Sequence, residues 1–223
     1  MIRRVAFFKA RPEAGQAAVH ELESRIRAIP QLCKAVRRVG LGVASTNANA
    51  AGTWSHMWDL EFADLTGAHA YAAWERSSLA AIDPAKAGSV VEKIDYIYFE
   101  PGTFGTKMKG LKHPVRRPMM FRMSEKATAA EIKKTEDIIN QMPKEIPQIK
   151  SWCLSKTAGL PTPTPWTHVR EHELESEAAV KEYADHPYHV NVVGVHFREL
   201  MKSGAIATLS IAWYTAPESF IAP

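Results

Sequence analysis

The spacing of apolar and polar residues changes along the chain in the same order twice. An apolar stretch at Val5–Phe8 predicts a strand, and residues 19–26 then carry apolar side chains at helical spacing. The second half repeats this change at residues 119–123 and 132–142. Another strand, a histidine-bearing strand, a shorter helix and a last strand complete each half. The order βαββαβ is the ferredoxin-like plan.

Local sequence matches between the halves indicate a tandem duplication. RRVAFFKA at residue 3 recurs as RRPMMFRM at 116, IPQLCKAV at 29 as IPQIKSWC at 146, TWSHMWDLEF at 53 as PWTHVREHEL at 165, and AYAAWERS at 70 as EYADHPYH at 182. Each match is short, but all four occur in the same order at offsets of 112 to 117 residues. Such self-similarity at a fixed offset is typical of a repeated structural unit.

The predicted fold class is therefore α+β, with two fused ferredoxin-like βαββαβ domains. The first domain spans residues 1–100 and the second spans residues 115–217, and the segment 101–114 between them is rich in Gly, Lys and Pro, which predicts a linker. An antiparallel sheet with helices on one face leaves its other face bare. The two copies are thus expected to pack face to face as an α+β barrel within one chain.

Composition narrows the class of protein. With 223 residues and 46% hydrophobic residues, the chain can bury a sizeable core. The formal charge of +4 comes from basic residues that are spread along the chain, so nucleic acid binding is not indicated. No apolar run approaches the roughly 20 residues needed to cross a bilayer, and the N-terminus does not resemble a signal peptide. We expect a cytoplasmic protein in which Cys33 and Cys153 are buried apolar residues.

Histidines concentrate in the second copy. Five of the nine lie between His168 and His196, and the segment EYADHPYHVN at 182–191 holds two of them beside a tyrosine and a proline. The histidine side chain has an unperturbed pKa near neutral pH. A local cluster of histidines is therefore a candidate site for proton transfer or for metal binding.

At these residues the chain resembles the stress-responsive dimeric α+β barrel family. That family carries the signature Y-x-x-H-P-x-H after a strand containing T-H, and here the signature reads Tyr183, His186, Pro187 and His189 after Thr167–His168. The resemblance covers nearly the whole chain as two fused copies of a domain that usually dimerises into a barrel. Family members include olivetolic acid cyclase, fern hydroxynitrile lyases and stress proteins with no settled chemistry, so the resemblance implies the fold more strongly than the function.

The cyclase-type members imply cofactor-free chemistry by a tyrosine and the second histidine of the signature. Carried over to this chain, the acid/base pair is Tyr183 and His189, with His168 as a third catalytic candidate. The first copy keeps His56, Tyr71 and Arg4 as a second candidate site, but it has Trp-Glu-Arg-Ser at 74–77 where the second copy has His-Pro-Tyr-His. The implied pair is complete only in the second copy.

Strand alternation gives an independent argument for a pocket. His168, Arg170 and His172 share one face of their strand, and buried polar groups are costly unless they are paired or hydrated. The alternative is that this face is solvated and that Val169 points inward. Polar candidates for substrate binding are Arg117, His172, Arg170 and His186. Candidates for an apolar wall are Phe121, Met119, Trp166 and Trp213.

The function predicted from these residues is that of a lyase or cyclase that needs no cofactor. It would act on a small aromatic or carbonyl compound by aldol or retro-aldol chemistry, such as ring closure, cyanohydrin cleavage or loss of formaldehyde. Alternatives are a metal site of His186 and His189 with His168 or His172, a haem ligated by His189 or His196, and a noncatalytic ligand-binding barrel. The expected partner is a small-molecule substrate, not nucleic acid or membrane, and the two-repeat chain is a candidate homodimer.

Overall fold

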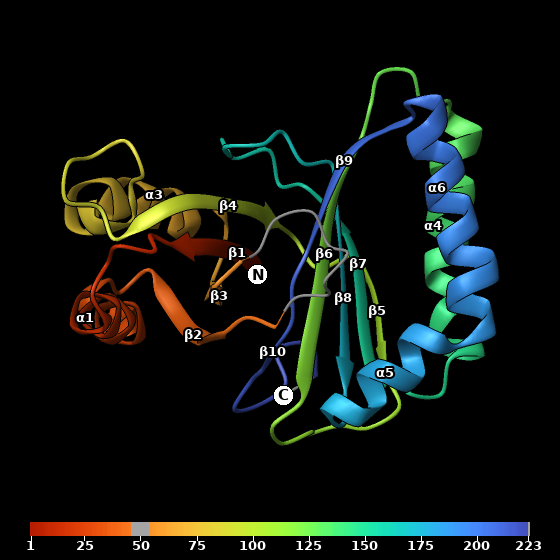
Figure 1. The fold of residues 1–223 in the computed structure, drawn as a ribbon, viewed down its shortest axis with the longest axis horizontal. Coiled ribbons are helices and arrows are strands. Elements are labelled where there is room, and N and C mark those ends of the chain that lie inside the picture. The colour runs from red at the N-terminus through yellow and green to blue at the C-terminus, as the bar shows by residue number, and fades with distance from the viewer. Residues whose placement is uncertain (46–53, 223) are drawn as a thin grey trace. The chain divides into compact units, whose positions relative to one another are not determined.

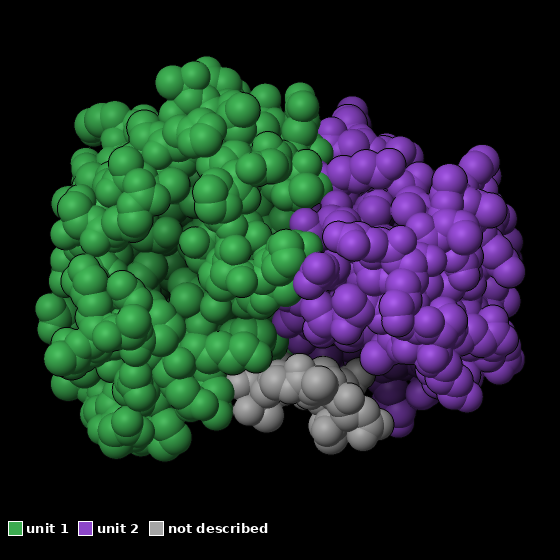
Figure 2. Space-filling model, turned by 90° about the horizontal axis from the view of Figure 1, so that it is seen from above, with its two compact units in different colours: residues 1–100, 157–165 green, residues 101–156, 166–223 purple. Residues whose placement is uncertain are grey.

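The computed structural model describes residues 1–45 and 54–222, and the chain divides into two compact units. Unit 1 comprises residues 1–100 and 157–165, and unit 2 comprises residues 101–156 and 166–223 (Figure 2). Hydrogen bonds within unit 1 explain why 157–165 belongs to it. The Ala158 N–H donates to the Tyr98 carbonyl at 2.7 Å, and the Thr164 hydroxyl donates to the Asp95 carboxylate at 2.7 Å.

Unit 1 is a four-stranded antiparallel sheet in the order β2-β3-β1-β4, with helices on one face (Figure 1). Its elements are β1 (Ile2–Ala10), α1 (Gln16–Arg27), α2 (Ile29–Leu32), β2 (Val36–Val43), β3 (His56–Phe62), α3 (Leu65–Ser78), the 3-10 turn η1 (Ala80–Ile82) and β4 (Val91–Phe99). Every residue of β1 from Ile2 to Phe8 is buried. The predicted βαββαβ order is confirmed, and it places the β1 side chains at the centre of the unit.

Unit 2 repeats this plan, with β9-β6-β8-β7 as the matching four strands. Its elements are β5 (Thr103–Thr106), β6 (Val115–Met123), α4 (Ala129–Glu145), β7 (Ser151–Lys156), β8 (His168–Leu174), α5 (Glu177–Asp185), the π-helical segment η2 (His189–Val193), α6 (Gly194–Ser203), β9 (Ile206–Ile211) and β10 (Tyr214–Thr215). The α+β, ferredoxin-like fold class is thereby confirmed. Closure of a barrel by the two sheets stays a prediction.

The fourth strand of unit 2 is split opposite a proline. The pairings Met119–Ile211 and Arg116–Tyr214 continue one register, yet β9 and β10 separate between them. Pro118 lies on β6 at this break and has no N–H to donate to a ladder. Because the register continues across the break, Trp213 lies opposite Arg117.

The structure differs from the sequence prediction in the segment 101–114. Residues 103–106 of the expected linker form β5, which pairs with β7 from Thr103–Leu154 to Thr106–Ser151. A strand there covers hydrogen-bonding groups that the edge of the sheet would otherwise leave unpaired. This segment therefore extends the sheet of unit 2.

Two helices run side by side on one face of this sheet (Figure 1). One is α4, which begins with the capping box that Thr128 and Glu131 predict: each side chain accepts a hydrogen bond from the other residue's backbone N–H. The other is α6, which ends at Gly204 in the left-handed conformation. The Thr135 hydroxyl of α4 and the His196 Nε2 of α6 are 2.9 Å apart. The sequence did not predict this second helix after the signature.

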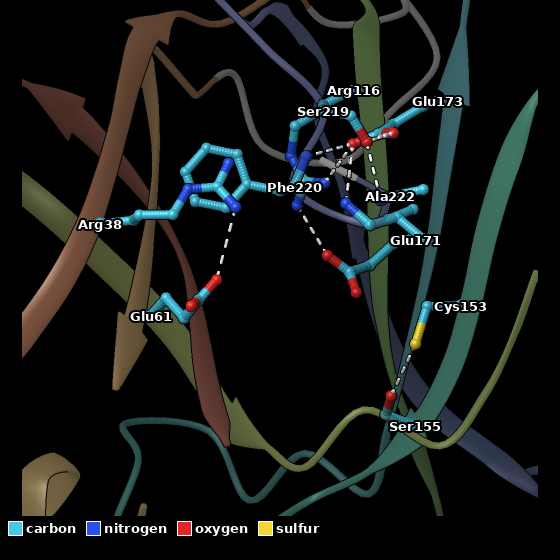
Figure 3. A network of polar contacts seen from close by, with 11 residues as sticks. Arg38, Glu61, Arg116, Cys153, Ser155, Glu171, Glu173, Ser219, Phe220 and Ala222 are labelled. Atoms are coloured by element: carbon cyan, nitrogen blue, oxygen red, sulfur yellow. Dashed lines mark hydrogen bonds and ion pairs between the residues drawn. The ribbon is translucent and has the colours of Figure 1, made fainter. Parts of the chain in front are cut away.

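The opposite face of the sheet holds a buried ion-pair network (Figure 3). The Arg116 guanidinium lies 2.6 Å from the Glu171 carboxylate and 3.0 Å from the Glu173 carboxylate, and all three residues are buried. The Phe220 N–H donates to Glu173 at 2.8 Å, and the Ser219 hydroxyl donates to the same carboxylate. The sequence reasoning took the glutamates as a sign of a poor core. They are instead paired, and they hold residues beyond the predicted domain end at 217.

Both cysteines, Cys33 and Cys153, are free and buried, as predicted. No helix in residues 1–45 or 54–222 is both long and apolar enough to cross a bilayer.

Candidate functional site

A row of four side chains crosses the helix-covered face of the unit 2 sheet. The strand register places His172 between Trp152 of β7 and Arg117 of β6. Continuing the β6–β9–β10 register adds Trp213 on the other side of Arg117. Two basic side chains are thus flanked by two indole rings.

Tyr183 reaches this row from α5. The ring is fully buried, and the hydroxyl accepts a hydrogen bond from Arg117 Nη1 at 3.3 Å. The Arg117 guanidinium carbon lies 4.9 Å from the centre of the Tyr183 ring, and the His172 ring meets that ring edge-on at 5.7 Å. A buried tyrosine hydroxyl is thereby fixed beside a cation.

The proline of the signature breaks the helix and brings His189 to Tyr183. A residue before proline disfavours helical geometry, and His186 accordingly has the extended angles φ −61° and ψ 132°. The chain resumes as a helix at Pro187 and passes at His189 into the π-helical segment η2, a type of distortion common at functional sites. As a result the rings of Tyr183 and His189 lie 4.5 Å apart.

The hydrogen bonding of His189 fixes its tautomer. Nδ1 lies 3.0 Å from the Ala184 carbonyl oxygen, which can only accept, so Nδ1 carries the proton and Nε2 keeps its lone pair. Burial, together with the charges of Arg117 and Arg170, lowers the pKa of His189 to about 4. The sequence reasoning assumed a pKa near 7. The two guanidiniums explain the difference, and the ring is neutral at pH 7.

Arg170 and His172 are buried side chains whose nitrogen atoms are only partly hydrogen-bonded. Arg170 donates to the Met142 sulfur at 3.3 Å, but Arg170 Nε and His172 Nδ1 have no hydrogen-bond partner among the described residues. Burial lowers the pKa of Arg170 to about 10, while Tyr183 raises it and Arg117 lowers it. Burial and the charges of Arg170 and Arg117 also hold the pKa of His172 well below its usual value. Within the described residues, neither arginine forms an ion pair with a carboxylate.

Residues 115–208 match the family described as Stress responsive A/B Barrel Domain. This part of the chain is a stress-responsive A/B barrel domain. The match covers the βαββαβ core of unit 2 and the signature residues Tyr183 and His189. No curated protein matches the chain, and the expected likeness to olivetolic acid cyclase is not shown.

Several solved structures share the fold over nearly the whole chain. An anthrone oxidase-like protein matches with a TM-score of 0.67 at 10% identity, over 96% of this chain and 90% of its own. A proposed monooxygenase from Fusobacterium nucleatum matches with a TM-score of 0.56 at 10% identity, over 100% and 95% of the two chains. At this identity the likeness establishes the fold alone.

His168 of the A/B barrel domain lies apart from the Tyr183 group. It is paired with Phe121, four residues along β6 from Arg117, a separation of about 13 Å on a strand. Its ring stacks on Phe121 at 4.8 Å, and its nitrogens contact Glu136 at 3.3 Å and Thr167 at 2.8 Å. Unit 1 has the same arrangement at His56. His168 therefore lies outside the group formed by Tyr183 and His189, and its catalytic role stays a prediction.

The remaining predicted residues divide between the site and its surroundings. Met119, Phe121 and Trp213 belong to the same hydrophobic core as Tyr183, whereas Trp166 is buried outside that core. His186 is partly exposed, and its Nδ1 accepts a hydrogen bond from the Tyr188 N–H. That contact caps the resumed helix, so His186 helps to position His189.

The second candidate site, in unit 1, is built differently. Arg4 is fully buried, and its guanidinium carbon lies 4.7 Å from the Trp58 ring and 4.1 Å from the Tyr96 ring. The Tyr71 hydroxyl donates to Glu75 Oε1 at 2.7 Å, and Arg4 Nη2 lies 3.2 Å from the same oxygen. Sequence reasoning missed Glu75, although its place four residues after Tyr71 puts both on one helix face.

A cavity of about 310 Å³ opens beside this carboxylate. Six of the nine lining residues are uncharged and mostly apolar: Leu79, Ile82, Pro84, Ile94, Tyr96 and Pro163. The other three are charged: Glu75, Arg76 and Asp83. His56 lies outside this lining, paired with Glu23 at 2.9 Å. The three predicted residues of this site therefore do not converge on one cavity.

The alternative metal site is not supported by the geometry. In the described ranges 1–45 and 54–222, no three His, Cys, Asp or Glu side chains gather as ligands. His168 contacts Glu136, away from His189, and His196, the other residue considered for haem, is buried against Thr135.

Proposed function

We propose that unit 2 is a cofactor-independent lyase or cyclase that acts on a small aromatic or carbonyl compound. The observation that carries this proposal is the position of the His189 ring. Its Nδ1–H donates to the Ala184 carbonyl, so Nε2 is free to act as a base, and the centres of the His189 and Tyr183 rings lie 4.5 Å apart. A base with a fixed tautomer beside a hydrogen-bonded phenol can supply the general base and the hydrogen-bond donor of aldol-type chemistry.

In the retro-aldol direction, His189 Nε2 takes the proton of a β-hydroxyl group. The adjacent carbon–carbon bond then breaks and an aldehyde leaves. The electron pair of the broken bond stays with the remaining fragment as an enolate, whose negative charge lies on its carbonyl oxygen. The Tyr183 hydroxyl and the guanidiniums of Arg117 and Arg170 hold the negative charges of the bound substrate and of the anion that forms. The imidazolium returns its proton to carbon, and ring closure follows the same steps in reverse.

The low pKa of His189 suits this sequence of events. Above about pH 5 the ring is unprotonated in the free protein, so the base is fully available. The two guanidiniums that disfavour the imidazolium also favour the anion formed at the same time. Once that anion is present, it offsets their charge and makes protonation of His189 easier.

The test is turnover of phenolic, β-keto and hydroxymethyl-aryl compounds by the full chain, with products identified by mass spectrometry. We expect His189→Ala to lower kcat/KM about 10²- to 10⁴-fold. Tyr183→Phe removes one hydrogen-bond donor to these negative charges and should lower kcat/KM about 10²-fold. His69→Ala replaces an exposed histidine of α3; it is the matched control and should leave kcat/KM unchanged.

Two other outcomes would replace the proposal. Equal turnover by wild type and His189→Ala would show that the base is elsewhere. Compounds that bind in a His189-dependent way without any turnover would support the noncatalytic ligand-binding alternative. Oxygen consumption is followed in the same assays, because similar structures carry the names anthrone oxidase-like protein and proposed monooxygenase.

A further inference from the structure

Each unit buries an arginine at the same place in its sheet, but the groups around that arginine differ. Arg4 and Arg117 occupy equivalent places, since Arg4 pairs with Leu60 across strands as Arg117 pairs with His172. Both arginines lie beside a buried tyrosine from the helix that follows the neighbouring strand, Tyr71 on α3 in unit 1 and Tyr183 on α5 in unit 2. Differences between the units are therefore differences around one shared Arg–Tyr pair.

In unit 1 a carboxylate from the protein completes this pair. Because α3 continues to Ser78, Glu75 lies one turn beyond Tyr71 on the same face. Its Oε1 accepts the Tyr71 hydroxyl at 2.7 Å and lies 3.2 Å from Arg4 Nη2. A buried guanidinium is costly without such a counter-charge.

In unit 2 the position four residues after Tyr183 is Pro187, which carries no carboxylate and ends the helix. Arg117 instead donates directly to the Tyr183 hydroxyl. A second buried guanidinium is added as well, because Arg170 occupies the place of Trp58: each pairs across strands with an equivalent residue of the first strand. Unit 1 balances one cation with one anion, whereas the described residues of unit 2 place two cations and no anion around Tyr183.

We propose that the ligand of unit 2 carries a carboxylate, which takes the place that the Glu75 side chain occupies in unit 1. It accepts hydrogen bonds from the Tyr183 hydroxyl and the Arg117 guanidinium. Arg170, whose Nε has no hydrogen-bond partner in the described part of the chain, then faces a second oxygen atom of the ligand, the one that gains charge during the reaction. This substrate class, an aryl or keto carboxylic acid, rests on the proposed function for the identity of the site.

Benzoate and its neutral analogue benzamide are the probes, with binding to the full chain measured by calorimetry. We expect benzoate to bind at least tenfold more tightly than benzamide. Arg117→Met should remove this preference. Arg122→Met is the matched control, because Arg122 lies on the same strand, faces the opposite side, and should leave the preference intact. Equal affinity for both probes, or benzoate binding that Arg117→Met does not weaken, overturns the inference.

Wild-type protein supplies a measurement that does not depend on a variant folding. The His189 ring proton signals are titrated by NMR with each probe. Bound benzoate should raise the pKa of His189, because its charge offsets Arg117 and Arg170, and benzamide should not. An unchanged titration at saturating benzoate overturns the proposed position of the carboxylate.

The results also separate this inference from the proposed function. Benzoate binding that depends on Arg117, with no turnover of any compound, would retain the carboxylate site and remove the lyase. His189-dependent turnover of neutral carbonyl compounds, with no preference for benzoate, would do the opposite.

Discussion

The Glu75 carboxylate accepts a hydrogen bond from the Tyr71 hydroxyl at 2.7 Å, and the same oxygen lies 3.2 Å from Nη2 of the fully buried Arg4. Replacing Glu75 by Leu leaves that guanidinium buried without a counter-charge. We expect the free energy of unfolding to fall by about 3–5 kcal/mol, the usual cost of breaking a buried pair. Urea unfolding of the full chain measures the loss.

The control for this variant is Glu92→Leu. Glu92 pairs with Lys9 at 2.9 Å, but both side chains are more than a third exposed. Such a surface pair contributes about 0–1 kcal/mol. Similar losses from the two variants would mean that Glu75 does not neutralise Arg4.

A second prediction concerns the pH dependence of catalysis. The pKa of His189 in the free protein is about 4, and the base must be unprotonated to act. The acid limb of kcat/KM should therefore lie near pH 4, well below that of an ordinary histidine. The acid limb of kcat should lie higher, because a bound anion raises the pKa of His189. An acid limb of kcat/KM near 6.5 would show that His189 is not the titrating base.

Stability should also depend on pH through the buried histidines. The pKa of His172 lies well below its usual value in the folded protein and returns to about 6.5 on unfolding. Between these values the unfolded chain binds more protons, so the free energy of unfolding falls as pH drops below about 6.5. We expect the melting temperature to fall from pH 7 to pH 5, and to fall less in His172→Asn. A variant with an unchanged slope would contradict this source of the dependence; His69→Asn is the exposed control.

The helix break at Pro187 is the subject of a fourth prediction. Pro187→Ala removes the restriction on His186 and allows α5 to continue. Continuation would carry His189 away from the Tyr183 ring, so turnover and ligand binding should be lost while the unit stays folded. The ring-current shift of the His189 signals measures the contact directly. Retention of that shift in Pro187→Ala would show that packing, not proline, holds the break. Pro143→Ala, at a proline inside α4, is the control.

Sequence patterns predicted most of the secondary structure of this protein, because the fold consists of local periodicities that occur twice. Alternating and helical spacing predicted βαββαβ in both halves, while the pairing of Tyr183 with His189 was implied by the resemblance to the family signature. The periodicities join residues within one or two turns of a helix or along one strand, where geometry follows from chain position. The same local reasoning failed for β5, since a short Gly-containing segment becomes a strand only when an edge is there to pair with.

Tertiary structure decided the rest, because it depends on register and packing between distant segments. His168 and Tyr183 looked like partners in sequence, but the β6–β8 register places His168 four residues away from the row that holds Arg117. Glu171 and Glu173 looked unfit for a core until Arg116 and the C-terminal residues enclosed them. The chain by itself determined two related domains. Only the folded arrangement gave one unit a carboxylate of its own and left the other with two buried cations, since a charge is balanced by what surrounds it in space.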